Sequence, residues 1–146
     1  MREMLAQIID EAKNAVVAVI KGADDVMSAL RSAVRNQVGG AVKDAETLAV
    51  TAVDAVSGVV TGAVEAAAET GTDLGKAAVW VVEEAIESAQ TVGVDATDAA
   101  TAAVSGAIRA AEKIGGQTAS IVREALLGAA TLPRDVVERV LKGSEE

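Results

Sequence analysis

Apolar and polar residues recur along this chain with a period of eleven residues. With the positions of the repeat lettered a to k and Val16 at position a, positions a, d, e and h are mostly apolar or small, whereas position f is polar in every row from Lys21 to Lys142. Eleven residues make three turns of an α-helix, so positions a, d, e and h share one face. The pattern predicts an amphipathic helix that must bury this face.

The register of the repeat does not slip between residues 1 and 132, which predicts one long, nearly continuous helix over that range. A repeat of about 3.67 residues per turn gives a straight or slightly right-handed supercoil, and the apolar face is wide enough to contact more than one partner helix. The predicted fold is therefore all-α, a hendecad coiled coil of several helices. Pro133 interrupts the repeat and predicts a short terminal helix with a frayed tail over residues 133–146.

The glycines give a compact alternative, because glycine-rich positions favour turns. The chain could instead fold back as an antiparallel hairpin or bundle at Gly39–Gly40, Gly71–Gly75 or Gly115–Gly116.

Glycine also recurs with a period of 22 residues. At position c these glycines are Gly40, Gly62, Gly106 and Gly128, with Glu84 in the middle place of the series. At position a they are Gly71, Gly93 and Gly115. Glycine inside a helix is unfavourable by roughly 1 kcal/mol relative to alanine. Two interpretations remain open: either helix backbones approach closely at these glycines, or the glycines are tolerated remnants of a drifting repeat.

The apolar stripe, meaning the apolar positions of the repeat, is the candidate functional surface. We expect copies of the chain to associate through it into a homo-oligomeric bundle or filament. Its selected members are Val16, Val38, Val60, Gly71, Val82, Gly93, Val104, Gly115, Leu126, Val42, Val53, Val64, Ile86, Ile108, Ala45, Ala67, Ala89 and Ala111.

Two residues depart from the pattern. Arg31 falls at position e, on the edge of the apolar stripe, and either extends its charged end to solvent or forms an ion pair that fixes the register of two helices. Trp80 is the sole aromatic residue and falls at position j, on the polar face. Together with Val79 it predicts a lateral contact with a partner, the alternative being a single exposed apolar side chain.

The amino-acid composition mainly limits which catalytic and metal-binding side chains the chain can supply. The chain has no His, Cys or Tyr, so the usual general bases, thiol nucleophiles and most transition-metal ligands are missing. Its carboxylates are grouped, as at Asp24–Asp25 and Glu83–Glu84, but without the spacing of a metal site, so we interpret them as solvated helix faces. We expect no enzymatic activity, no cofactor and no metal.

Charge narrows the class of partner. The net charge is -9, and from Asp44 to Ile108 Lys76 is the only basic residue against eleven acidic ones, which disfavours nucleic acid and anionic membranes. The longest charge-free runs are about half the ~20 residues that a membrane span needs, so we expect no transmembrane segment. The first residues lack the unbroken apolar stretch of a secretory signal, and we expect a cytoplasmic location.

The repeat of positions a, d, e and h resembles that of hendecad coiled-coil proteins over nearly the whole chain. That resemblance implies a self-associating structural protein. The segment from Gly58 to Glu69, rich in Val, Ala, Gly and Thr, is more loosely similar to the eleven-residue repeats of synucleins and perilipins. This second resemblance implies an alternative function: an amphipathic coat on a neutral lipid droplet, a granule or a weakly charged membrane. The chain lacks the lysine-rich repeat flanks of synucleins.

Overall fold

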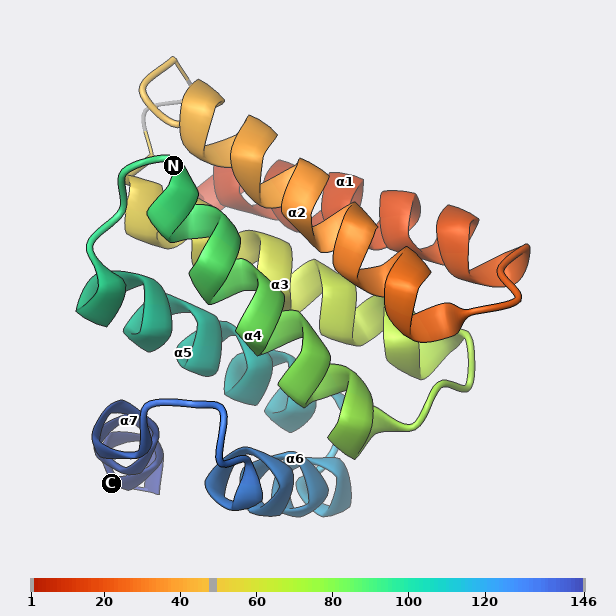
Figure 1. Cartoon of the computed structure of the whole chain (residues 1–146), viewed down its shortest axis with the longest axis vertical. Coiled ribbons are helices and arrows are strands. Elements are labelled where there is room, and N and C mark those ends of the chain that lie inside the picture. Colours follow the sequence, from red (N-terminus) through yellow and green to blue (C-terminus); the bar gives the residue numbers. More distant parts are fainter. Residues whose placement is uncertain (1, 48–49, 146) are drawn as a thin grey trace.

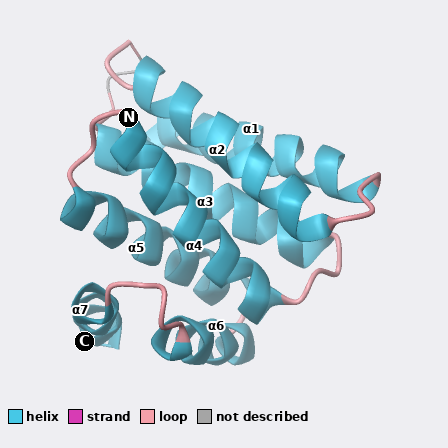
Figure 2. Cartoon of the chain, in the orientation of Figure 1, coloured by secondary structure: helices cyan, strands magenta, loops and turns pink. Residues whose placement is uncertain are grey.

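The computed structural model describes residues 2–47 and 50–145, which are mostly helical (Figure 2). The helices are α1 (Arg2–Lys21), α2 (Val26–Asp44), α3 (Ala52–Glu69), α4 (Leu74–Thr91), α5 (Ala96–Ile114), α6 (Gly116–Gly128) and α7 (Arg134–Glu145). No strand occurs in this part of the chain. The all-α class predicted from the sequence is confirmed.

The prediction of one nearly continuous helix over residues 1–132 is wrong, because the chain turns back after each of the first helices (Figure 1). Gly71 and Gly93 lie in the α3–α4 and α4–α5 loops with φ of +76° and +95°. This left-handed conformation ends a helix, and glycine adopts it without strain. Two residues later, the carboxylates of Asp73 and Asp95 cap the first turns of α4 and α5. A glycine stop followed by an aspartate start therefore divides the repeat into separate helices.

The 22-residue period of the sequence is the length of one helix with its loop. The N-cap residues of α3, α4 and α5 are Thr51, Asp73 and Asp95, each 22 residues after the one before. Each helix thus holds enough of the repeat to bury its apolar face against neighbours in the same chain.

The compact alternative was correct at two of its three break points. The segment Gly71–Gly75 contains the α3–α4 turn, and Gly115 separates α5 from α6. Gly39–Gly40 lies inside α2, where the helix continues to Asp44, so the predicted turn there is wrong. Pro133 immediately precedes α7.

The helices form two layers (Figure 1). In the odd layer α3 packs between α1 and α5, and α7 packs on the other side of α5; in the even layer α4 packs between α2 and α6. Successive helices from α1 to α5 are antiparallel, so α1, α3 and α5 run parallel to one another, as do α2 and α4 (Figure 1). Each helix from α3 to α7 therefore contacts the helix two before it in the chain.

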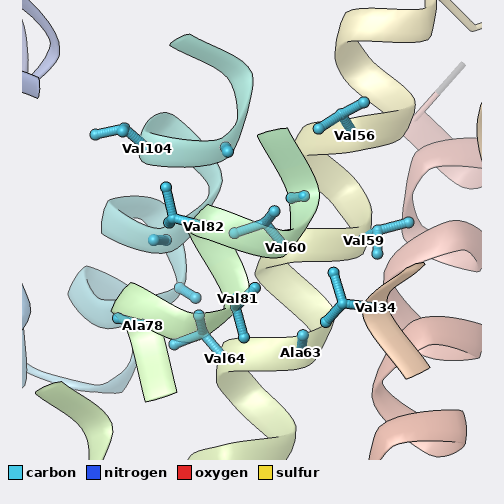
Figure 3. Close-up of a cluster of buried hydrophobic side chains, with 14 of the residues drawn as sticks. Val34, Val56, Val59, Val60, Ala63, Val64, Ala78, Val81, Val82 and Val104 are labelled. Carbon is cyan, nitrogen blue, oxygen red and sulfur yellow. The ribbon is translucent and has the colours of Figure 1, made fainter. Parts of the chain in front are cut away.

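The interior between the layers consists almost entirely of Val and Ala side chains. Figure 3 shows Val34 of α2, Val60 of α3, Val82 of α4 and Val104 of α5 meeting there, and each of them is completely buried. Small side chains let helices pack at short range, which is how a core without Phe or Tyr fills its volume.

Candidate functional site: the buried stripe and its repeated helix contact

The apolar stripe forms the interior of a single chain. The following members are no more than 4% exposed: Val16, Val38, Val60, Val82, Val104, Leu126, Val64, Ile108, Ala45, Ala67, Ala89 and Ala111. Val42, Val53 and Ile86 are partly buried against the same core, Gly71 and Gly93 are exposed in loops, and Gly115 is partly exposed. In this closed form the stripe faces the chain's own helices rather than a partner.

Position c of the repeat marks the contact between neighbouring helices of the odd layer. A Cβ added to Gly62 in α3 would overlap the carbonyl oxygen of Ile9 in α1 and lie 2.9 Å from the amide nitrogen of Lys13. A Cβ added to Gly106 in α5 would lie 2.5 Å from the carbonyl oxygen of Ser57 in α3. Only glycine permits backbones this close. The close-approach interpretation is confirmed for these two glycines.

Thr61 adds a polar bond to the contact between α3 and α5. Its side chain is 2% exposed, and its hydroxyl oxygen lies 2.8 Å from the carbonyl oxygen of Ser57 and 3.1 Å from that of Gly106. The hydroxyl can donate to either carbonyl, one in its own helix and one in the neighbouring helix. This bond between helices is within reach because Gly106 has no side chain to hold the backbones apart.

The even layer carries a charged contact at the same position of the repeat. Glu84 of α4 is 5% exposed. Its carboxylate accepts hydrogen bonds from Nε of Arg35 in α2 at 3.2 Å and from the hydroxyl of Ser88 at 3.0 Å. Arg31 in α2 lies 4.0 Å from Glu84 and donates to the neighbouring Glu83 at 2.5 Å. Hydrogen bonds to this buried carboxylate compensate for its loss of solvent.

The backbone contact and the charged contact occupy equivalent places. Three pairs of residues, each 49 positions apart, make them: Lys13 with Gly62, Arg35 with Glu84, and Ser57 with Gly106. Glu84 is thus not a random exception in a glycine column. At this position helices are held together by backbone proximity in the odd layer and by ion pairs to the buried carboxylate of Glu84 in the even layer.

Position c is uncovered at the ends of the stack. Nothing lies within 4 Å of a Cβ added to Gly40 in α2 or Gly128 in α6, and Ala18, the equivalent residue of α1, is exposed. The close-approach prediction is therefore wrong for Gly40 and Gly128. At Gly40 no helix of the described residues lies close enough to contact an added side chain atom within 4 Å.

The glycines of position a also do not mark close packing. Nothing lies within 4 Å of a Cβ added to Gly71, Gly93 or Gly115. Gly71 and Gly93 serve the turns described above, and Gly115 connects α5 to α6.

Both exceptions to the repeat have a defined environment. For Arg31 the ion-pair interpretation is confirmed, because its guanidinium binds Glu83, whose other carboxylate oxygen accepts a hydrogen bond from Thr131 in the α6–α7 loop. Val79 and Trp80 are partly buried and pack against the main core. Their lateral contact with a partner stays a prediction.

The sequence analysis did not identify Thr61 or the Arg35–Glu84 pair as specific contacts. The available signal was Glu84 itself, an acidic residue in a column of small ones. Its partners could not be found in the same way, because the repeat does not state which helices are neighbours.

The carboxylate groups of the described residues do not gather into a metal site, since no three His, Cys, Asp or Glu side chains there are placed to hold an ion. Asp25 has a local structural role as the N-cap of α2. Hydrogen bonds from the backbone amide and the hydroxyl of Ser28 to its carboxylate lower the pKa of Asp25. None of the helices in this part of the chain is both long and apolar enough to span a bilayer.

Comparison with known proteins gives no relative from which a function could be transferred: no family model, no curated protein and no solved structure matches the chain. The molecule is thus defined by its architecture, a two-layer all-α stack in which α3 meets α1, α4 meets α2 and α5 meets α3 at position c.

Proposed function

We propose that the protein is a non-enzymatic structural protein that self-associates, and that the edge formed by α1 and α2 is its contact surface. The observation that carries this proposal is the position-c contact. Gly62, Glu84 and Gly106 are covered by an earlier helix, whereas at the same position Ala18 of α1 is exposed and a Cβ added to Gly40 of α2 meets nothing within 4 Å. A helix of a second copy can approach the small residues of this edge as closely as α1 approaches Gly62.

The surface properties of this edge support the proposal. Val19 of α1 and Met27 of α2 are 40% and 39% exposed, so both helices present apolar side chains to solvent. The charge of residues 1–43 is nearly balanced, with six basic and five acidic residues, whereas residues 44–108 carry one basic and eleven acidic residues. Two copies that meet through α1 and α2 therefore avoid the repulsion expected between their acidic middles.

The test is the substitution Gly40→Leu, read out by sedimentation velocity over a wide range of protein concentration. The new side chain fits the isolated chain because a Cβ at Gly40 meets nothing within 4 Å, but it prevents another helix from approaching closely. Gly128→Leu is the matched control, since Gly128 occupies the same repeat position at the other end of the even layer and is equally open. We expect wild type and Gly128→Leu to form oligomers and Gly40→Leu to remain monomeric.

Two outcomes would contradict this proposal. A wild-type chain that is monomeric at every concentration does not self-associate. Equal assembly of Gly40→Leu and wild type means that the α1–α2 edge is not the contact surface.

A second candidate function is an amphipathic coat on a neutral lipid or polymer surface. It is favoured by the register of the repeat, which stays in phase across the α3–α4 and α4–α5 loops. If these loops became helical, α3, α4 and α5 would join into one helix with a continuous apolar face. The present interior of Val and Ala loses less on opening than one of larger side chains, because full burial of a Val side chain stabilises by only about 1.5 kcal/mol or somewhat more.

A disulfide clamp tests the second candidate. A Cβ at Gly75 in α4 lies 3.5 Å from the Cβ of Ala125 in α6, a separation that suits a disulfide. The chain has no cysteine of its own, so Gly75→Cys with Ala125→Cys introduces a single bridge. In a continuous helix these positions would be ~75 Å apart, and the bridge forbids that state.

We expect the reduced double variant to float with phosphatidylcholine-coated triacylglycerol droplets and the oxidised form to remain in the aqueous phase. The single variant Ala125→Cys controls for the oxidising treatment. Failure of the wild type to float would exclude the coat function, whereas flotation of the oxidised clamp would show that coating does not require the helices to open.

A further inference from the structure

A pocket of about 760 Å³ lies at the end of the stack where α1 ends, α2 begins and the α3–α4 loop enters α4. Ile20, Val26 and Trp80 supply its apolar wall, and Lys21 and Lys76 supply basic groups. Its volume falls in the range of small-molecule sites in proteins, roughly 300–1,000 Å³. The pocket thus combines two cations with the sole aromatic side chain of the chain.

The two lysines are the available charges of this pocket. Neither Lys21 nor Lys76 forms an ion pair with a carboxylate in the described part of the chain. Lys76 is also the only basic residue from Asp44 to Ile108, so its place beside Trp80 and Lys21 concentrates positive charge in an otherwise acidic region.

The two carboxylates that also line the pocket are already engaged. Glu69 lies 3.4 Å from the ammonium group of Lys13. Asp73 accepts a hydrogen bond from the backbone amide of Lys76 at 3.0 Å, as the N-cap of α4, and there its negative charge is stabilised by the helix dipole. The groups left to recognise a ligand are therefore the two ammonium groups and the apolar wall.

We propose that this pocket binds a small amphipathic anion of the medium-chain carboxylate class. The carboxylate lies between the ammonium groups of Lys21 and Lys76, and the hydrocarbon chain lies against Ile20, Val26 and the indole ring of Trp80. A cationic amphiphile would be repelled by the two ammonium groups, which have no carboxylate partner of their own among the described residues, and a neutral one would leave both without a ligand. This site lies at the α1–α2 turn, beside Val19 and Met27, but its argument does not rest on the proposed function.

Trp80 provides the measurement, because it is the only tryptophan and it lines the pocket. Intrinsic fluorescence of the full chain is followed during titration with sodium decanoate below its micellar concentration, and calorimetry of the same titration detects binding independently of the fluorophore. Decyltrimethylammonium and decanol are the cationic and neutral probes of equal chain length. We expect a saturable change with decanoate and a much weaker response to the other two.

Lysine variants locate the anion. Lys21→Gln and Lys76→Gln each remove one ammonium group without breaking a described ion pair, and each is expected to weaken decanoate binding by about tenfold, as a lost charge-assisted hydrogen bond does. Lys43→Gln is the matched control, because Lys43 is an exposed lysine in the last turn of α2, at the opposite end of that helix.

The proposal is overturned if decanoate gives neither heat nor a fluorescence change. It is also overturned if decyltrimethylammonium or decanol binds as tightly as decanoate, or if both lysine variants bind decanoate like the wild type. These results do not depend on the oligomeric state measured for Gly40→Leu, so failure of one proposal is distinguishable from failure of the other.

Discussion

At the scale of single residues, glycine has two opposite structural roles in this chain. Gly62 and Gly106 lie inside helices and keep a side chain out of a contact with a neighbouring backbone. Gly71 and Gly93 lie between helices and provide a positive φ. The sequence could predict that glycine recurs, but not which role each one has, because both roles follow the same 22-residue period. A substitution by alanine therefore has a different consequence at each place.

We predict that Gly62→Ala lowers the free energy of unfolding by about 1–3 kcal/mol, the usual effect of overpacking a core. The added methyl group would collide with the backbone of α1, which cannot move as a flexible side chain can. Gly40→Ala is the control and should raise the free energy of unfolding by about 0.5–1 kcal/mol, because alanine favours helix and the site is open. Urea unfolding of both variants measures the difference, and equal effects would disprove the close contact at Gly62.

Asp25 gives a prediction on pH dependence. Its pKa is lowered from the ordinary value of 3.8, first by the hydrogen bond from the amide of Ser28. The carboxylate therefore contributes stability above pH 3.8, and this contribution is lost as the pH falls through the lower pKa of the folded state. Thermal melts should show Asp25→Ala less stable than wild type near neutral pH, with the difference shrinking in acid.

The variant Asp25→Asn is the control for that experiment. Asparagine caps a helix without a titrating group, so the stability that it adds relative to Asp25→Ala should not change with pH. An acid-independent difference between wild type and Asp25→Ala would contradict the assigned role of the carboxylate.

At the scale of helices, the unit of the fold is one helix with its loop, 22 residues long in the middle of the chain. The helical class and the buried face could be predicted, because position within the repeat determines which side is apolar. The positions where one helix ends and the next begins were harder to predict. A unit of 22 residues is two full repeats, so the register is identical whether the helix continues or folds back. The local signal was present in Gly71-Thr72-Asp73 and Gly93-Val94-Asp95, where a glycine stop precedes an aspartate cap.

The candidate site was predictable to a smaller extent. Position c of the repeat could be recognised as unusual from the sequence. The ion pairs could not be predicted, because Arg31 and Glu83 are 52 positions apart and Arg35 and Glu84 are 49 positions apart. Such pairs follow from the order of helices in a layer, and nothing in a single amphipathic pattern specifies that order.

We predict that Gly71→Ala combined with Gly93→Ala destabilises the folded chain by about 2–4 kcal/mol, since alanine is unfavourable in the left-handed region by about 1–2 kcal/mol per residue. Gly39→Ala is the control, because Gly39 lies within α2 and an added Cβ meets nothing there. Urea unfolding monitored by circular dichroism reports the change. A double variant as stable as wild type would contradict the assigned turns.

At the scale of the whole molecule, the helices within each layer are joined by a different kind of contact. The odd layer relies on close backbones at Gly62 and Gly106, and the even layer relies on the ion pairs of Glu84. Among the described residues, position c is open at the α1–α2 edge, at Ala18 and Gly40. The proposed self-association follows from this geometry rather than from an unused apolar stripe.

The proposed self-association predicts a melting temperature that depends on concentration, because association stabilises the folded state by mass action. Far-UV circular dichroism should show the melting temperature of the wild type rising with protein concentration and that of Gly40→Leu remaining constant. Gly128→Leu should behave as the wild type does. A melting temperature of the wild type that is independent of concentration would contradict self-association.

The repeated contact at position c also determines how a chain of this design can change in length. Gly62 and Gly106 are 44 residues apart and make the same kind of backbone contact. Excising a 44-residue segment that contains α3 and α4 would bring α5 onto α1 with a glycine again at the point of contact. Excising only 22 residues would place a buried glutamate opposite a backbone instead of two arginines. Insertions and deletions that preserve the architecture are therefore restricted to whole helix pairs, and relatives of different length should differ by multiples of that pair.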